Sequence, residues 1–181
     1  MTDRPIAARI HDALDRLAPH LEALKRHFVE ENRKFSALMA VDHDQLGRIL
    51  KAHLIVESYL QRYLEHELAV PGLDAIRLSF FQKAMLIADG SAAGFIKPSL
   101  VDLNSIRNAY AHRVDASITL GDMPNIIPIL RAARSEDGCV TVVDHIEAFT
   151  AVACAFLSIA PEGIRSVFDQ AFAGLDLGAG E

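Results

Sequence analysis

Apolar residues recur every three or four positions along most of this chain, which is the period of amphipathic helices. One stripe runs from Ile6 to Leu17 and a second from Leu21 to Leu38, so the sequence predicts two N-terminal helical segments. Pro19 lies between the stripes and predicts a break or a kink, because proline lacks the backbone N–H that a helix interior needs.

The pattern after residue 42 predicts further helices joined by short loops. A long helix is predicted from about Gln45 to Leu68, and the turn-forming pair at residues 71–72 ends that region. Ser79, Ser99 and Asp144 each stand before a helical run as N-cap residues, and Gln82 adds the spacing of a capping box to the first of them. With these caps, the remaining helices are predicted over residues 79–87, 99–114, 128–134, 144–160 and 161–172.

Strand signals are nearly absent from the sequence. The only β-branched cluster, at residues 140–143, predicts a short extended lead-in to the next helix. We therefore expect an all-α protein, with a single helical-bundle domain of about six to eight helices over residues 1–177 and a frayed tail over residues 178–181.

Composition agrees with an ordinary globular protein. Hydrophobic residues make up 51% of the chain and charged residues 23%. The net charge of -6 argues against a protein that coats nucleic acid without regard to sequence, although it is compatible with a small local basic site.

Features that would place the chain outside the cytoplasm are missing from the sequence. Cys139 and Cys154 have no metal-type spacing and are predicted to be reduced thiols. The N-terminus lacks the apolar core of a signal peptide, and the longest apolar stretch, residues 148–160, is too short to span a bilayer. We expect a soluble cytoplasmic protein with no membrane segment.

One arginine falls on the apolar face of its own helix. At about 100° per residue, Arg107 shares a face with Leu100 and Leu103, and a guanidinium in that position needs a partner because it keeps its charge. His53 and Glu57 stand four residues apart within the apolar stripe of the long central helix. The stripe consists of Leu46, Leu50, Leu60 and Leu64. The simplest prediction is that the two helices pack together and that Glu57 pairs with Arg107.

Such a pair has two interpretations. A buried Arg–Glu pair can serve only to fix how two helices pack, or Arg107 can hold the oxygens of a phosphate, helped by Asn108. His112 follows Arg107 by five positions, about 140° away around the helix. It is either an exposed histidine at the helix end or a general acid–base group, which a symmetric dimer could bring to the phosphate.

The residues from Arg107 to His112 resemble the Arg-x4-His motif of HEPN domains, including the asparagine that commonly follows the arginine. The surrounding blocks are similar as well. Residues 53–60 resemble the HxxIExxL helix of bacterial HEPN-like proteins, and residues 78–83 and 103–108 follow in the order typical of mannitol operon repressors and their relatives. The resemblance covers about Leu46 to Asp115, which is the core of the chain.

This resemblance implies a helical bundle that forms a homodimer and acts as a metal-independent endoribonuclease, with a toxin or defence role in many members. It implies that Arg107 and His112 are catalytic, with Asn108 orienting the substrate and His53, Glu57 and Asn104 in supporting positions. The alternative implied by the mannitol-repressor branch is a non-catalytic regulatory module that binds a protein partner, such as an antitoxin or a regulator.

Other chemistry has little support in the sequence. Arg113, Lys97 and Lys83 are the nearest basic residues and therefore the candidates for contact with RNA. His53 and Glu57 supply only two potential metal ligands, and no glycine-rich phosphate loop is present, so we expect neither a metal nor a cofactor. No helix-turn-helix pattern supports direct reading of DNA.

Overall fold

The computed structural model describes residues 6–39, 43–70, 72–112, 117–133, 138–159 and 162–172. Within these residues every regular element is a helix and there is no strand, which confirms the predicted all-α class. The chain divides into two compact units, Met1–Val41 and Asp42–Glu181, where the sequence predicted one domain over residues 1–177. A helical period shows that a segment has an apolar face, but it does not show which partner covers that face.

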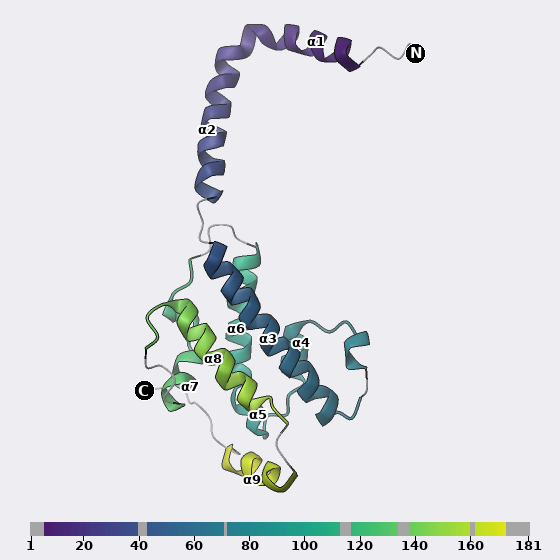
Figure 1. Cartoon of the computed structure of the whole chain (residues 1–181), viewed down its shortest axis with the longest axis vertical. Coiled ribbons are helices and arrows are strands. Elements are labelled where there is room, and N and C mark those ends of the chain that lie inside the picture. Colours follow the sequence, from purple (N-terminus) through teal and green to yellow (C-terminus); the bar gives the residue numbers. More distant parts are fainter. Residues whose placement is uncertain are drawn as a thin grey trace. The chain divides into compact units, whose positions relative to one another are not determined.

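The first unit contains α1 (Ile6–Leu17), η1 (Ala18–His20) and α2 (Leu21–Met39), drawn in purple to blue in Figure 1. Pro19 lies in the 3₁₀ turn η1, so the break predicted there is confirmed. No side chain whose exposure the structure describes in this unit is buried. Within this unit, therefore, no core covers the apolar stripes of α1 and α2.

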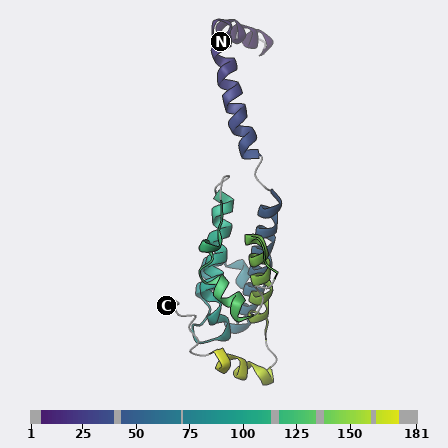
Figure 2. The ribbon, with the colours of Figure 1, turned by 90° about the vertical axis from the view of Figure 1, so that its left-hand side faces the viewer.

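The second unit is built around α3 (His43–Glu67), which packs along α8 (Val142–Phe156). The helices α6 (Lys97–His112) and α7 (Ile126–Ala132) pack against this pair, and Figure 2 shows α6 in a second layer beside α3 and α8. The short helix α4 (Phe80–Met85) contacts both α3 and α6. The remaining elements are η2 (Leu73–Ala75), α5 (Ala92–Phe95), η3 (Leu120–Asp122) and α9 (Glu162–Phe172).

Large aliphatic and aromatic side chains from α3, α6, α7 and α8 form one core. Each such side chain contributes about 1.5–3 kcal/mol when it is fully buried. The fully buried members include Ile49, Leu60, Leu64, Leu100, Leu103, Ile106, Ile126, Ile129, Leu130, Ile146 and Phe149. The stripe predicted on α3 is correct at Leu60 and Leu64, but near the start of α3 Ile49 takes the buried position, while Leu46 and Leu50 are only half-buried.

The predicted capping box at the start of α4 is confirmed. The backbone N–H of Ser79 donates to Gln82 Oε1 at 2.9 Å, and the backbone N–H of Gln82 donates to Ser79 Oγ at 3.3 Å. These two hydrogen bonds satisfy backbone donors that a helix start leaves unpaired. They also fix the residue at which α4 begins, and hence the direction in which Lys83 leaves the helix.

Two other predicted caps are wrong. The helix α6 begins at Lys97 rather than at Ser99, because Pro98 fits the first turn of a helix, and Ser99 is buried. Thr141 caps α8 in place of Asp144, whose carboxylate accepts from the Thr141 N–H at 2.8 Å as the third residue of a capping box.

Several sequence predictions fall on residues that the structure does not describe. Pro161, Val114, Arg134 and the tail at residues 178–181 lie outside the described ranges. None of the described helices combines the length and the apolarity needed to cross a bilayer.

Candidate functional site

The helix α3 places His53 and Glu57 one turn apart on the face that meets α4 and α6. His53 is buried, with 4% of its surface exposed, and its ring centre lies 4.3 Å from that of Phe80 on α4. The Glu57 side chain is 29% exposed, and its Oε2 lies 3.9 Å from His53 Nδ1. His53 is therefore buried as its place in the apolar stripe predicted, whereas Glu57 lies at the boundary between the core and a solvent-accessible surface.

The predicted partner of Glu57 is wrong. Lys83 Nζ on α4 donates to Glu57 Oε1 at 2.9 Å, and only 11% of the Lys83 side chain is exposed. The described residues contain no ion pair between Glu57 and Arg107. Because the capping box sets the start of α4, the Lys83 ammonium reaches Glu57 and neutralises the carboxylate that was expected to meet the arginine.

Arg107 is half-buried on α6, and its Nη1 donates to Asn108 Oδ1 at 3.0 Å. Among the side chains that the structure describes, it contacts no carboxylate within ion-pair distance. A guanidinium keeps its charge at any ordinary pH, so this arginine remains available to an anion from outside. The interaction with Asn108 orients the guanidinium without neutralising it.

These residues border one open cleft of about 370 Å³, called here the Arg107 cleft. Its wall joins α3, α6 and the start of α4, and it is lined by His53, Glu57, Ser79, Phe80, Phe81, Asn104, Arg107 and Asn108. The structure thus brings together five residues that the sequence singled out as catalytic or supporting. The volume is within the lower range of sites for small ligands and suits a group about the size of one nucleotide.

The sequence reasoning missed the contribution of the α4 N-terminus to the Arg107 cleft. Phe80 lies in the core, whereas the neighbouring Phe81 is 46% exposed beside the cleft. The Ser79 capping box was a usable signal that a helix starts here, but the sequence does not show against which helices that start packs.

Burial lowers the pKa of His53, because a charged imidazolium is costly to bury. The carboxylate of Glu57 opposes this shift, and the positive charges of Arg107 and Lys83 add to it. The Asn104 side chain lies near the ring and favours the charged form. His53 Nε2 is buried and has no well-formed hydrogen bond with any described residue. The imidazole therefore keeps a buried ring nitrogen that lacks a well-formed hydrogen bond.

The lowered pKa of His53 predicts a loss of stability in mild acid. The unfolded chain takes up a proton as the pH falls below about 6.5, while the folded chain resists doing so. Stability from this residue is therefore present above about pH 6.5 and is lost as the pH falls through the folded pKa. Urea unfolding between pH 8 and 5 should show a steeper decline for the wild type than for His53→Gln.

If the unfolding free energy depends on pH equally in the wild type and in His53→Gln, the assignment of the lowered pKa to His53 is contradicted.

His112 lies at the end of α6, as the sequence predicted, and its side chain is exposed. It does not line the Arg107 cleft. One chain therefore separates the guanidinium and the imidazole of the motif onto different parts of α6. Tyr110, between them, packs partly buried against the core.

The three basic residues proposed to contact RNA differ in their surroundings. Lys83 is held by Glu57, and Lys97 forms an ion pair with Asp89. Arg113 lies outside the described residues. The ion pairs of Lys83 and Lys97 would have to break before either ammonium group could bind a phosphate.

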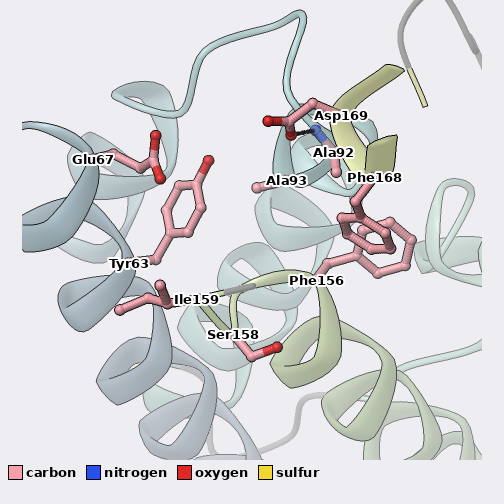
Figure 3. Close-up of a pocket in the computed structure, with 9 residues that line it drawn as sticks. All are labelled: Tyr63, Glu67, Ala92, Ala93, Phe156, Ser158, Ile159, Phe168 and Asp169. Atoms are coloured by element: carbon pink, nitrogen blue, oxygen red, sulfur yellow. Dashed lines mark hydrogen bonds between the residues drawn. The ribbon is translucent and has the colours of Figure 1, made fainter. Parts of the chain in front are cut away.

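A second cavity lies at the opposite end of α3 and is too small for a substrate. Figure 3 shows it between Tyr63 and the packed rings of Phe156 and Phe168, where Asp169 Oδ1 accepts from the Ala92 N–H at 3.1 Å. Its volume of about 30 Å³ holds one or two water molecules. The contacts in this region attach α9 to α5 and serve packing.

No group of three or more His, Cys, Asp or Glu side chains that could hold a metal ion occurs in the described part of the chain. No protein-family model, curated protein or solved structure matches this sequence. The interpretation of the Arg107 cleft therefore depends on its own geometry and on the motif.

Proposed function

We propose that this protein is a metal-independent endoribonuclease of the HEPN type, in which Arg107 binds the scissile phosphate and His112 transfers protons. The observation that carries the proposal is that Arg107 borders an open polar cleft and keeps an unpaired positive charge. The nearby carboxylate of Glu57 forms its ion pair with Lys83 instead. The planar guanidinium fits two phosphate oxygens and stabilises the charge that develops on them during cleavage.

Cleavage of RNA by its own 2′-hydroxyl requires two proton transfers. A base removes the proton from the 2′-oxygen as it attacks phosphorus, and an acid protonates the 5′-oxygen as its bond to phosphorus breaks. One chain offers one exposed motif histidine, outside the Arg107 cleft. We propose that two copies of the chain supply the two His112 side chains, one as base and one as acid, around a shared phosphate.

The test of this function is RNA cleavage in the presence of EDTA by purified protein. Arg107→Ala should lower the cleavage rate by about 10²–10³-fold, because it removes a charged donor to the phosphate. Arg107→Lys should recover only part of the rate, since lysine keeps the charge but lacks the planar fork.

Arg62→Ala is the matched control, because Arg62 is exposed on α3, stacks over Tyr59 and does not line the cleft. Its cleavage rate should equal that of the wild type. A wild type that cleaves no RNA, or cleavage that survives in Arg107→Ala, would defeat the proposal.

A second candidate is the non-catalytic regulatory module, and the charge distribution favours it. Residues 42–181 carry 11 Lys or Arg and 18 Asp or Glu, and both Lys83 and Lys97 are already paired with carboxylates. Such a surface attracts an RNA backbone weakly. In this case the Arg107 cleft binds an acidic group of a protein partner, and the wild type shows no EDTA-resistant cleavage.

A further inference from the structure

The first unit carries an apolar stripe that no other described residue of this unit covers. This surface, called here the N-terminal stripe, consists of Ile10, Leu14, Leu17, Leu21, Leu24, Phe28 and Phe35. Leu24 is half-buried, and the other six are between 44% and 64% exposed. Their spacing alternates between four and three residues, with one member of the series replaced by Glu31.

Helices with such a stripe are not stable alone. The helix α1 has 12 residues and α2 has 19, and isolated helices of this length are marginal in water. Amphipathic helices gain most of their stability when the apolar face packs on a partner. An occupant of the N-terminal stripe is therefore needed to hold the first unit in its helical form.

We propose that the N-terminal stripe pairs with the same stripe of a second copy of this chain. Alternating steps of four and three residues are the a and d positions of a coiled coil, and α1 and α2 each carry them, on either side of the η1 break. The six half-exposed side chains of the stripe expose on the order of 600 Å² of apolar surface per copy, which a partner helix could bury. Stable dimers bury roughly 800 Å² per partner, so the stripe supplies most of the required area.

The residues beside the stripe favour a second copy over a different protein. Coiled coils select foreign partners through opposite charges at the flanking e and g positions. Here those positions hold no acidic residue and only two lysines: His11, Ala13, Ala18, His20, Lys25, His27, Asn32 and Lys34. Both lysines are already held within the chain, by Glu22 at 2.8 Å and by Glu31 at 2.7 Å. No charge on the flanks therefore requires a partner of opposite sign.

The polar face also disfavours an anionic membrane surface. Helices that lie on such membranes carry an excess of Lys and Arg opposite the apolar face. Residues 1–41 carry seven Lys or Arg and six Asp or Glu. Arg33 pairs with Glu30 at 2.8 Å in addition to the two lysine pairs. The polar face is thus nearly neutral, and three ion pairs within α2 hold six of its charges.

The test is the association state of the full-length chain, measured by analytical ultracentrifugation over a range of concentrations. Phe28→Glu should raise the dissociation constant at least about 30-fold, as expected for loss of a buried aromatic anchor. The matched control is Val29→Glu, because Val29 is 71% exposed on the same helix but lies off the stripe. It should leave the dissociation constant within a few-fold of the wild type.

Glu31→Leu gives the opposite test. It places an apolar side chain at the one polar position of the series and should lower the dissociation constant. A monomeric wild type, or equal effects of Phe28→Glu and Val29→Glu, would overturn the proposal. Flotation with phosphatidylcholine–phosphatidylglycerol vesicles that depends on Phe28, without self-association, would overturn it in favour of a membrane surface. A monomeric wild type would also exclude the two-copy site proposed for RNA cleavage, whereas equal effects of Phe28→Glu and Val29→Glu would overturn the present proposal alone.

Discussion

Replacement of His112 by alanine is expected to lower the rate of RNA cleavage by about 10²–10⁴-fold, the usual contribution of a general acid or base. His112 is exposed at the end of α6, so its removal leaves the core intact and the protein should stay folded. Circular dichroism and thermal unfolding should therefore match the wild type. The loss of rate would then report chemistry rather than unfolding.

His66→Ala is the matched control, since it removes another partly exposed histidine, at the end of α3, away from the motif. It should cleave RNA at the wild-type rate. If His112→Ala and His66→Ala cleave RNA at equal rates, His112 has no catalytic role and the non-catalytic regulatory function is favoured.

Mixing His112→Ala with the wild type tests whether two copies share one site. If both His112 side chains are needed, a pair that contains one variant chain is inactive. At equal amounts, after exchange of subunits, only about one quarter of the pairs are fully wild type, so activity should fall to about one quarter. A fall to about one half would show that each chain works alone.

Gly94→Ala is expected to destabilise the second unit by about 2–3 kcal/mol, a typical cost of overpacking. A Cβ at this position would lie 2.5 Å from the Ala88 carbonyl oxygen and 2.7 Å from that of Asp89. Both are backbone atoms, which cannot turn away as a flexible side chain would. The turn is also held by Ser91, which donates to Ala88 O at 2.8 Å and accepts from the Gly94 N–H at 3.1 Å.

Gly47→Ala is the control of opposite sign. Gly47 lies in the first turns of α3, and a Cβ there would meet no atom within 4 Å. Alanine should stabilise this helix by about 0.5–1 kcal/mol, because it loses less backbone freedom on folding. Urea unfolding of both variants gives the comparison, and equal stability of the two would show that the 88–91 turn moves freely.

Much of the local structure is readable from the sequence. Helical period, the Pro19 break and the Ser79–Gln82 capping box all depend on residues within a few positions of one another. The same short range explains the errors at the starts of α6 and α8. Ser99 and Asp144 are acceptable caps, but Pro98 and Thr141 stand nearby and fit the helix start better.

Only part of the candidate site could be predicted from the sequence. Periodicity placed His53 and Glu57 together on α3 and Arg107 on the facing helix, and all three border one cleft. The partner of Glu57 depended on α4, which brings Lys83 from 26 positions away. A short helix between two longer ones has no period of its own that reveals the direction of its side chains.

The sequence by itself determined that this protein is helical and where most helices lie, and it singled out five residues that line the Arg107 cleft, because these features follow from spacing along the chain. Only the tertiary structure decided that Lys83 rather than Arg107 neutralises Glu57, that Arg107 faces an open cleft and that residues 10–36 lack a core. Ion pairing and burial are set by which helices meet, and that choice is made by the whole fold rather than by neighbours in sequence.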